Sequence, residues 1–165
     1  MREEDGLKDL GEAALHRALQ LLGRRAYTEA ELTARLGKEG FPKGAVENAA
    51  LYAARCGYLD DAEVARREVE RCFTEKGWGP YRVRQRLRQR GLAPELIAEV
   101  LSLWGEPEVR ALCLAVAEKK LRFAASPDQG WRAAQVGRYL LRRGFPPEVV
   151  EWCLNRLAPS DGESG

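Results

Sequence analysis

The sequence predicts an all-α protein made of three tandem three-helix repeats that form an elongated, curved array. Two observations predict this fold class. Three segments align on a glycine, each with apolar residues spaced by four before the glycine and a proline shortly after it. A further amphipathic segment precedes each of them, which gives a period of roughly 50 residues, a length typical of helical arrays.

The recurring glycines are Gly40, Gly91 and Gly144. Around them recur Leu32, Val83 and Val136, then Leu36, Leu87 and Leu140, then Phe41, Leu92 and Phe145, then Val46, Ile97 and Val150, and last Ala50, Leu101 and Leu154. Apolar residues four apart lie on one side of a helix, and a glycine just past them ends that helix in a left-handed conformation. A proline then opens a second helix, where its missing N–H is not needed. These prolines are Pro42, Pro94, and Pro146 with Pro147.

A further helix is expected before each pair of helices joined by a glycine turn, at residues 12–23, 61–76 and 107–121. Their apolar stripes are Leu15, Leu19 and Leu22 in the first, Ala65, Val69, Cys72 and Phe73 in the second, and Val109, Leu112, Cys113 and Val116 in the third. Because each stripe has helical spacing, we expect it to face the core of its repeat.

Domain boundaries follow from these elements. They are an N-terminal tail at 1–11, repeats at 12–59, 60–104 and 105–158, and a C-terminal tail at 159–165. The C-terminal tail is polar and rich in small residues, so we expect it to be disordered. A longer loop at residues 123–131 breaks the symmetry of the third repeat.

Composition excludes several classes of protein. Of the 165 residues, 45% are apolar and 32% are charged, which is too apolar for a disordered chain. No segment approaches the roughly 20 apolar residues that span a bilayer, and the N-terminus lacks the apolar run of a signal peptide. We therefore expect a soluble, cytoplasmic protein with no membrane partner. With a net charge of only +2, the chain as a whole is not a polycation. A negatively charged partner would therefore have to bind a local basic surface.

No set of residues predicts catalysis or a metal site. The one histidine, His16, lies on an amphipathic helix, where a structural role is expected, and one histidine does not assemble a Ser-His-Asp triad with confidence. No P-loop is present. Asp60 and Asp61 stand where a helix begins, so we expect capping of its free N–H groups, with a partner contact as the alternative. We expect no enzyme activity and no cofactor.

The four cysteines lie far apart in the sequence, at Cys56, Cys72, Cys113 and Cys153. None shows the C-x-x-C spacing of a zinc site. We expect each to be a buried small apolar residue, with a zinc site or a disulfide as the alternative.

A basic segment, RVRQRLRQR at residues 82–90, has arginine at every second position. This alternation is typical of a strand, but Val83, Leu87 and Gly91 match helical positions of the other repeats, so we predict a helix. On such a helix the arginines form two ridges beside a buried apolar stripe. The ridges are Arg82, Arg86 and Arg90, and Arg84 and Arg88.

The basic segment has two interpretations. A charged run is usually a solvated helix face. No acidic residue lies between Lys76 and Pro94, however, and unpaired like charges at spacing four repel. Because arginine donates paired hydrogen bonds to phosphate or carboxylate, we predict an anionic partner, with the solvated face as the alternative.

Other residues extend this candidate surface. Trp78 and Tyr81, at the entrance of the helix, either pack on a neighbouring helix or stack on a base or a partner side chain. The matching helix of the third repeat is also basic, and the helix before it ends EKKLRF. The predicted partner- and DNA-binding residues are Lys76, Trp78, Tyr81, Arg82, Arg84, Arg86, Arg88, Arg90, Arg138, Arg142 and Arg143.

Three blocks of this sequence resemble the RecX regulatory proteins of bacteria. They read ALHRALQLLGRRAYTEAELTARL, then GYLDDAEVA, then KGWGPYRVRQRLRQRGLAPELI. Each block alone is weak, but the three in this order are specific, and they match the family's pattern over residues 12–157. The third repeat matches less distinctly, above all at its SPDQGW loop. The resemblance implies tandem three-helix repeats, in agreement with the glycine pattern.

The resemblance also implies a function. Proteins of this family modulate the RecA recombinase, mostly by inhibition, and are not enzymes. It implies a protein that lies in the groove of the RecA filament on DNA and bridges its protomers. Such a protein suppresses ATP hydrolysis, strand exchange and coprotease activity, and so regulates recombination, repair and the SOS response. Direct contact with single- and double-stranded DNA is implied as well, and we expect a monomer.

Two other functions remain open from the residues alone. An independent DNA-binding module would dock a helix in the major groove. Against it, the basic segment offers only Gln85 and Gln89 as base readers besides arginine. A plain helical scaffold would bind no partner through these arginines.

Overall fold

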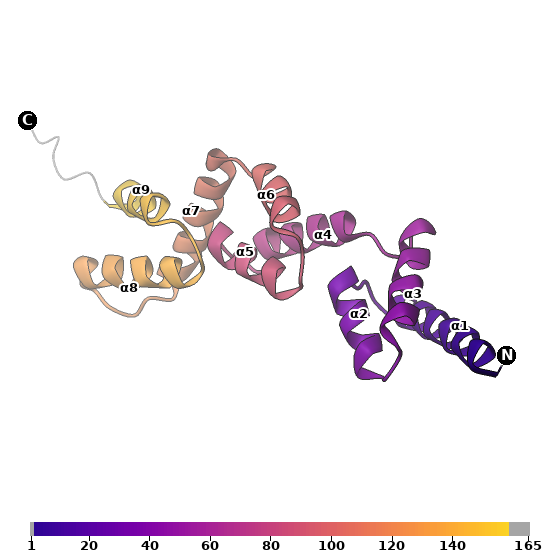
Figure 1. The fold of residues 1–165 in the computed structure, drawn as a ribbon. Helices are drawn as coiled ribbons and strands as arrows, with labels where there is room; N and C mark the ends of the chain where they lie inside the picture. Colours follow the sequence, from indigo (N-terminus) through magenta and orange to yellow (C-terminus); the bar gives the residue numbers. More distant parts are fainter. Residues whose placement is uncertain (1, 159–165) are drawn as a thin grey trace, which may run out of the picture. The chain divides into compact units, whose positions relative to one another are not determined.

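The computed structural model describes residues 2–158 and contains nine α-helices and no strand within them (Figure 1). The helices are α1 (Arg2–Leu22), α2 (Glu29–Lys38), α3 (Lys43–Arg55), α4 (Asp61–Thr74), α5 (Pro80–Gln89), α6 (Pro94–Ser102), α7 (Glu106–Arg122), α8 (Gln129–Arg142) and α9 (Pro147–Leu157). This confirms the predicted all-α class. The expected disorder at 159–165 lies outside the described residues.

Contacts between residues divide the chain into two compact units. Within the described residues, the first holds 2–67 together with 87–97, and the second holds 68–86 and 98–158. In the first unit α1, α2 and α3 pack on one another, and in the second α7, α8 and α9 do the same. Helices α4, α5 and α6 contribute to both units. The boundaries between the three repeats stay a prediction.

Helix α1 differs from its prediction in two ways. It begins at Arg2, so the first residues are helical where a tail was expected. Its buried residues are Ala14, Ala18 and Leu21, whereas the predicted stripe of Leu15, Leu19 and Leu22 lies at the edge of the contact and is only partly buried. The stripe prediction is therefore confirmed only in part: Leu15 and Leu22 pack against the core, but the fully buried positions of α1 belong to other residues.

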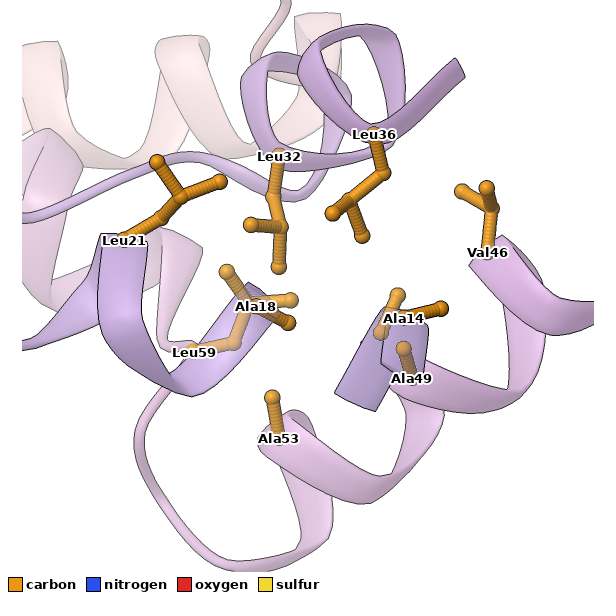
Figure 2. Close-up of a cluster of buried hydrophobic side chains, with 10 residues drawn as sticks. Ala14, Ala18, Leu21, Leu32, Leu36, Val46, Ala49, Ala53 and Leu59 are labelled. Atoms are coloured by element: carbon orange, nitrogen blue, oxygen red, sulfur yellow. The ribbon is translucent and has the colours of Figure 1, made fainter. Parts of the chain in front are cut away.

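Small side chains explain how α1 is packed. Figure 2 shows Ala14 and Ala18 of α1 close to Ala49 and Ala53 of α3, with leucines of α2 above them. The small alanine side chains let the backbones of α1 and α3 lie close together. The larger Leu32 of α2 then fills the space beside these two helices. A hydrophobic core therefore forms at a contact that contains mostly alanine.

The glycine-anchored turns are confirmed in all three repeats. Gly40, Gly91 and Gly144 have φ values of 92°, 74° and 92°. In each turn the N–H of the next residue donates to the carbonyl five residues before it, as in Phe145 N–H to Leu140 O at 3.2 Å. This is the Schellman arrangement that ends a helix at a left-handed residue. The aligned residues before the turn are all buried: Leu32, Leu36, Val83, Leu87, Val136 and Leu140.

The remaining helices bury most of their predicted stripes. The whole stripe of α4 is buried, namely Ala65, Val69, Cys72 and Phe73. In α7, Val109 and Cys113 are buried, and Leu112 and Val116 are partly buried. The cysteines are all free, and Cys56 alone among them is exposed, which corrects the expectation that every cysteine is buried.

The start of α2 packs on the turn that ends α5, within the first unit. The Thr28 hydroxyl donates to the Arg90 carbonyl at 2.6 Å, and Arg90 Nε donates to Glu31 Oε1 at 2.8 Å. Thr28 and Glu31 also form a capping box at the start of α2. We call residues 28–31 with 90–91 the first junction.

The start of α5 packs in the same way on the turn that ends α8, within the second unit. The Gly79 N–H donates to the Arg143 carbonyl at 2.7 Å, and the Tyr81 N–H donates to the Gly144 carbonyl at 2.9 Å. In the repeat alignment Gly79 corresponds to Thr28. We call residues 79–82 with 143–144 the second junction. The same contact between a helix start and a glycine turn thus occurs twice.

Replacing Glu31 with glutamine at the first junction should make stability less dependent on pH. Burial alone would raise the pKa of Glu31, but hydrogen bonds from Arg90, the Thr28 backbone and Arg25 outweigh it and hold that pKa below its ordinary 4.5. Since the folded chain favours the carboxylate, Glu31 stabilises the unit above pH 4.5, and this contribution is lost as pH falls further.

After solvent screening the contribution of Glu31 is about 0.5–1 kcal/mol. Urea unfolding of wild type and Glu31→Gln, at neutral pH and again near pH 3, measures it. We expect the two proteins to differ at neutral pH and to converge in acid. A difference that is the same at both pH values would contradict the ion-pair account.

Candidate partner-binding site

Helix α5 carries the basic segment, and its apolar stripe is fully buried. Val83 and Leu87 are 0% exposed, which confirms a helix in place of the apparent strand. The arginines lie on both sides of this stripe. Arg84 and Arg88 are exposed, and the other three are partly buried. The two predicted ridges therefore have different surroundings.

Arg86 and Arg90 are partners of acidic residues from other helices. Arg86 Nε donates to Glu68 Oε1 at 2.9 Å, and the Glu68 side chain is only 7% exposed. Arg90, whose side chain is 13% exposed, binds Glu31. The sequence argument treated the segment as unpaired because no acid lies near it along the chain. These two arginines instead connect α5 to α4 and to α2.

Two cations lie over the ring of Trp78 at the entrance of α5. Lys76 Nζ is 4.3 Å and Arg82 Cζ is 4.1 Å from the centroid of its ring. The Trp78 N–H donates to the Cys72 carbonyl at 3.0 Å, which holds the backbone here against the end of α4. Tyr81, by contrast, is 52% exposed. Trp78 therefore has partners within the chain, and the Tyr81 ring is available for stacking.

The basic residues of α8 also divide into two groups. Arg138 and Arg142 are exposed, while Arg143 lies over the ring of Tyr139 at 5.2 Å. Lys120 of α7 lies over the same ring at 4.7 Å. Lys120 and Tyr139 were absent from the predicted site, although EKKLRF, which contains Lys120, was noted as basic.

Four cations thus lie over two aromatic rings of the second unit, one pair over Trp78 and the other over Tyr139. They are Lys76, Arg82, Lys120 and Arg143. Within the described residues none of the four forms an ion pair. Arg143 Nε is buried without a hydrogen-bond partner. None of these four charges is therefore neutralised by an ion pair within the described residues, and Arg143 has an unused donor.

Of the acidic pair at the start of α4, Asp60 caps that helix as predicted, whereas Asp61 accepts a hydrogen bond from the start of α2. Asp60 Oδ1 accepts the Glu63 N–H at 3.1 Å, and Asp61 Oδ1 accepts the Glu29 N–H at 2.8 Å, so each caps a different helix. His16 contacts Gln20 on an exposed face of α1. Among residues 2–158 no group of three or more side chains could hold a metal ion. No helix of that range is long and apolar enough to cross a bilayer.

Three profiles of RecX domains match this chain. They are described as the first, second and third three-helix domains of RecX and match residues 14–50, 60–101 and 108–154. Each match contains one of the recurring glycines. The three-helix repeats seen in the structure therefore correspond in order to those of RecX.

Whole-chain comparisons agree with the domain profiles. A protein of Halorhodospira halophila named Regulatory protein RecX is 37% identical over 93% of this chain and 93% of its own length. One of the same name from Deinococcus radiodurans is 37% identical over 89% of this chain and 69% of its own length. A crystal structure of RecX from Lactobacillus salivarius superposes with a TM-score of 0.83 over 91% of this chain and 97% of that one, at 16% identity. The last comparison shows a shared fold.

Proposed function

We propose that this chain, which belongs to the RecX family of regulatory proteins, binds the RecA–DNA filament and inhibits its ATPase, strand-exchange and coprotease activities. The observation that carries the proposal is the 37% identity, over nearly the full length of both chains, to a protein named Regulatory protein RecX. We propose action by binding, with no catalytic step of its own.

The basic surface supports an electrostatic contact with the filament. Arg84 and Arg88 lie one helical turn apart, are exposed, and form no ion pair within the described residues. Arginine forks fit both phosphates of DNA and carboxylates of a protein surface. Binding should therefore weaken as salt rises. The partly buried Arg86 and Arg90 support the contact indirectly, since their ion pairs with Glu68 and Glu31 hold α5 in place.

Replacing both Arg84 and Arg88 with alanine should weaken inhibition of RecA without unfolding the protein. Both side chains are exposed, so their loss removes no buried contact. If each contributes about 0.7 kcal/mol as an exposed charge contact, half-maximal inhibition should require about tenfold more protein. The measurement is a titration of RecA ATPase on single-stranded DNA at two salt concentrations, with helicity followed by circular dichroism.

The matched control removes two positive charges elsewhere, by Arg24→Ala with Lys38→Ala. Both control residues are exposed and form no ion pair within the described residues. We expect the control to inhibit nearly as well as wild type. If the Arg84 and Arg88 double variant inhibits as well as the control, α5 is not the contact surface. If inhibition persists when all DNA affinity has been removed, an independent DNA-binding module is excluded.

A further inference from the structure

Each of the two junctions joins the start of a middle helix to the glycine turn of the following repeat. The start of α2 packs on the Gly91 turn, and the start of α5 packs on the Gly144 turn. The described chain also contains the Gly40 turn and the start of α8, and these two take part in neither junction. They are therefore one turn and one helix start of the kinds that pack together elsewhere in this chain.

The Gly40 turn has the form of the other two turns but an open surface. Its φ of 92° equals that of Gly144. A Cβ built on Gly91 would overlap the Cβ of Ala30, and one built on Gly144 would overlap the Arg82 backbone. At Gly40, apart from its chain neighbours, nothing lies within 4 Å of the corresponding position. The close approach that demands a glycine at the junctions thus has no counterpart at Gly40 within residues 2–158.

The backbone oxygens of the Gly40 turn are also unused. At the junctions the Arg90 carbonyl accepts the Thr28 hydroxyl, and the Arg143 carbonyl accepts the Gly79 N–H. In the part of the chain that the structure describes, the carbonyl of Glu39, at the corresponding position, accepts no hydrogen bond. These oxygens are the C-terminal end of α2, where the helix dipole favours a positive charge.

The start of α8 carries suitable residues at the positions that form the first junction. Counted back from the turn glycine, Ala134 corresponds to Ala30, the residue that lies against Gly91, and Ala134 is exposed. Arg132 corresponds to Thr28, which donates to a turn carbonyl. A small exposed residue permits close approach of a glycine turn, and a guanidinium donates readily to carbonyl oxygens.

Two polar side chains at this start lack hydrogen-bond partners. Arg132 Nε and Gln135 Oε1 are both buried, and neither has a partner within the described residues. Gln135 corresponds to Glu31, which binds Arg90 across the first junction. A buried polar atom without a partner is unfavourable, so the start of α8 has polar atoms that a docked turn could satisfy.

Apolar groups at the start of α8 are also incompletely covered. Trp131 is 47% exposed, whereas Tyr27 and Trp78, at the corresponding positions, are partly buried. A cavity of about 360 Å³ is lined by the first turns of α8 and by the ends of α7 and α9. Unfilled space and unpaired polar atoms together indicate one half of a junction that lacks its turn.

We propose that copies of this chain associate head to tail, with the Gly40 turn of one copy packed on residues 132–135 of α8 in the next copy. The contact repeats between copies the junction that each chain already contains twice. Arg132 then meets the carbonyl oxygens at the end of α2, which combines a cation with the negative end of a helix dipole. A monomer, as the sequence analysis expected, is the form at low concentration.

The two surfaces of this contact differ, which fixes how association proceeds. A contact between unlike surfaces leaves a free turn and a free helix start on every assembly, so growth does not stop at two copies. The inference goes beyond the proposed function, because the contact needs neither RecA nor DNA. On a filament that brings copies together, it would make the binding of neighbouring copies cooperative.

The first test is sedimentation equilibrium of the full chain between about 0.01 and 1 mM. A contact of this size belongs with the weak interfaces, which bury less than about 1,200 Å². We therefore expect a dissociation constant on the order of 0.1 mM. The average mass should rise from one chain to more than two. A mass of one chain throughout, or one that stops at two chains, would overturn the proposal.

The variant that blocks the helix start is Ala134→Glu. Its longer side chain fills the place of the turn glycine, and its charge opposes the carbonyl oxygens at the end of α2. We expect association at least about tenfold weaker than in wild type. The control is Ala115→Glu, the same change at an exposed alanine of α7, which should associate like wild type. Equal association of the two variants contradicts the proposal.

The variant that blocks the turn is Gly40→Asn, and it allows a complementation test. Asparagine adopts a positive φ more readily than most residues, so the turn is kept while its side chain occupies the contact. Gly40→Asn and Ala134→Glu should each associate weakly alone. An equimolar mixture should form pairs, because each variant supplies the surface that the other has lost. A mixture that stays monomeric while wild type associates shows that these two surfaces do not meet.

Circular dichroism checks that both variants are folded. A second mixture keeps the test decisive if Gly40→Asn does not fold. Ala134→Glu retains its turn but has no usable helix start, so it should end each assembly of wild-type chains. The average mass should then fall below that of wild type mixed with Ala115→Glu, and equal masses reject the contact. Since RecA is absent from all these mixtures, their failure leaves the proposed function untouched.

Discussion

Gly144→Ala is expected to destabilise the second unit by about 2–5 kcal/mol. Gly144 has φ of 92°, and an L-residue in the left-handed region costs about 1–2 kcal/mol. A Cβ at this position would also lie well inside van der Waals contact of the Arg82 backbone, which cannot rotate away as a side chain can. The start of α5 must then move, at a further cost of about 1–3 kcal/mol.

The matched control for this variant is Gly40→Ala, at the corresponding turn glycine of the first repeat. Gly40 has the same φ of 92°, but apart from its chain neighbours no atom lies within 4 Å of the place its Cβ would take. It should therefore cost only the conformational part, about 1–2 kcal/mol. Urea unfolding followed by circular dichroism gives both values. Equal costs for the two glycines would mean that the close approach at the second junction contributes nothing to stability.

Leu87→Ala is expected to cost about 2–5 kcal/mol, the usual range for a fully buried leucine. Leu87 is 0% exposed, and it lies in the middle of the basic helix, where its removal leaves a cavity beneath the arginines. Unfolding in urea should show a lower midpoint with little change in slope. Basic side chains on α5 would then be held less firmly.

Leu141→Ala is the control for the loss of the same side chain from a helix. Leu141 is 49% exposed, so little apolar surface returns to water and alanine is the better helix former. We expect a change within about 1 kcal/mol. A cost for Leu87→Ala as small as that for Leu141→Ala would show that the α5 stripe is not part of a packed core.

Helix type and turns could be predicted from the sequence because both depend on near neighbours. The spacing of Val83, Leu87 and Gly91, repeated twice elsewhere, outweighed the alternation of arginines. The error in α1 has a physical reason. Apolar spacing by four fits both the leucine stripe and the alanine stripe of an Ala- and Leu-rich helix. The choice between Ala14 and Leu15 depends on how closely α3 approaches, and no local pattern records that distance.

The candidate site stays a prediction, because none of its eleven residues has been tested against a partner. These residues were predicted from basic and aromatic composition, and the structure shows which of them have partners within the chain. The sequence around α5 shows no acid, yet Arg86 and Arg90 meet Glu68 and Glu31 in the folded chain. Lys120 of α7 likewise lies over Tyr139 of α8, a contact between two helices that the sequence did not predict.

The sequence by itself was therefore enough to predict three pairs of helices joined by glycine turns and a buried apolar stripe along α5. It was also enough to indicate the family with this pattern. The division of the α5 arginines into an ion-paired group and an exposed group required the folded chain. Helix formation and glycine turns depend on residues a few positions apart, whereas ion pairing at the junctions joins residues that are 59 positions apart, as with Arg90 and Glu31. Arg82 and Arg90 carry the same charge in the sequence, but in the folded chain Arg82 lies over Trp78 whereas Arg90 forms an ion pair with Glu31 across the first junction.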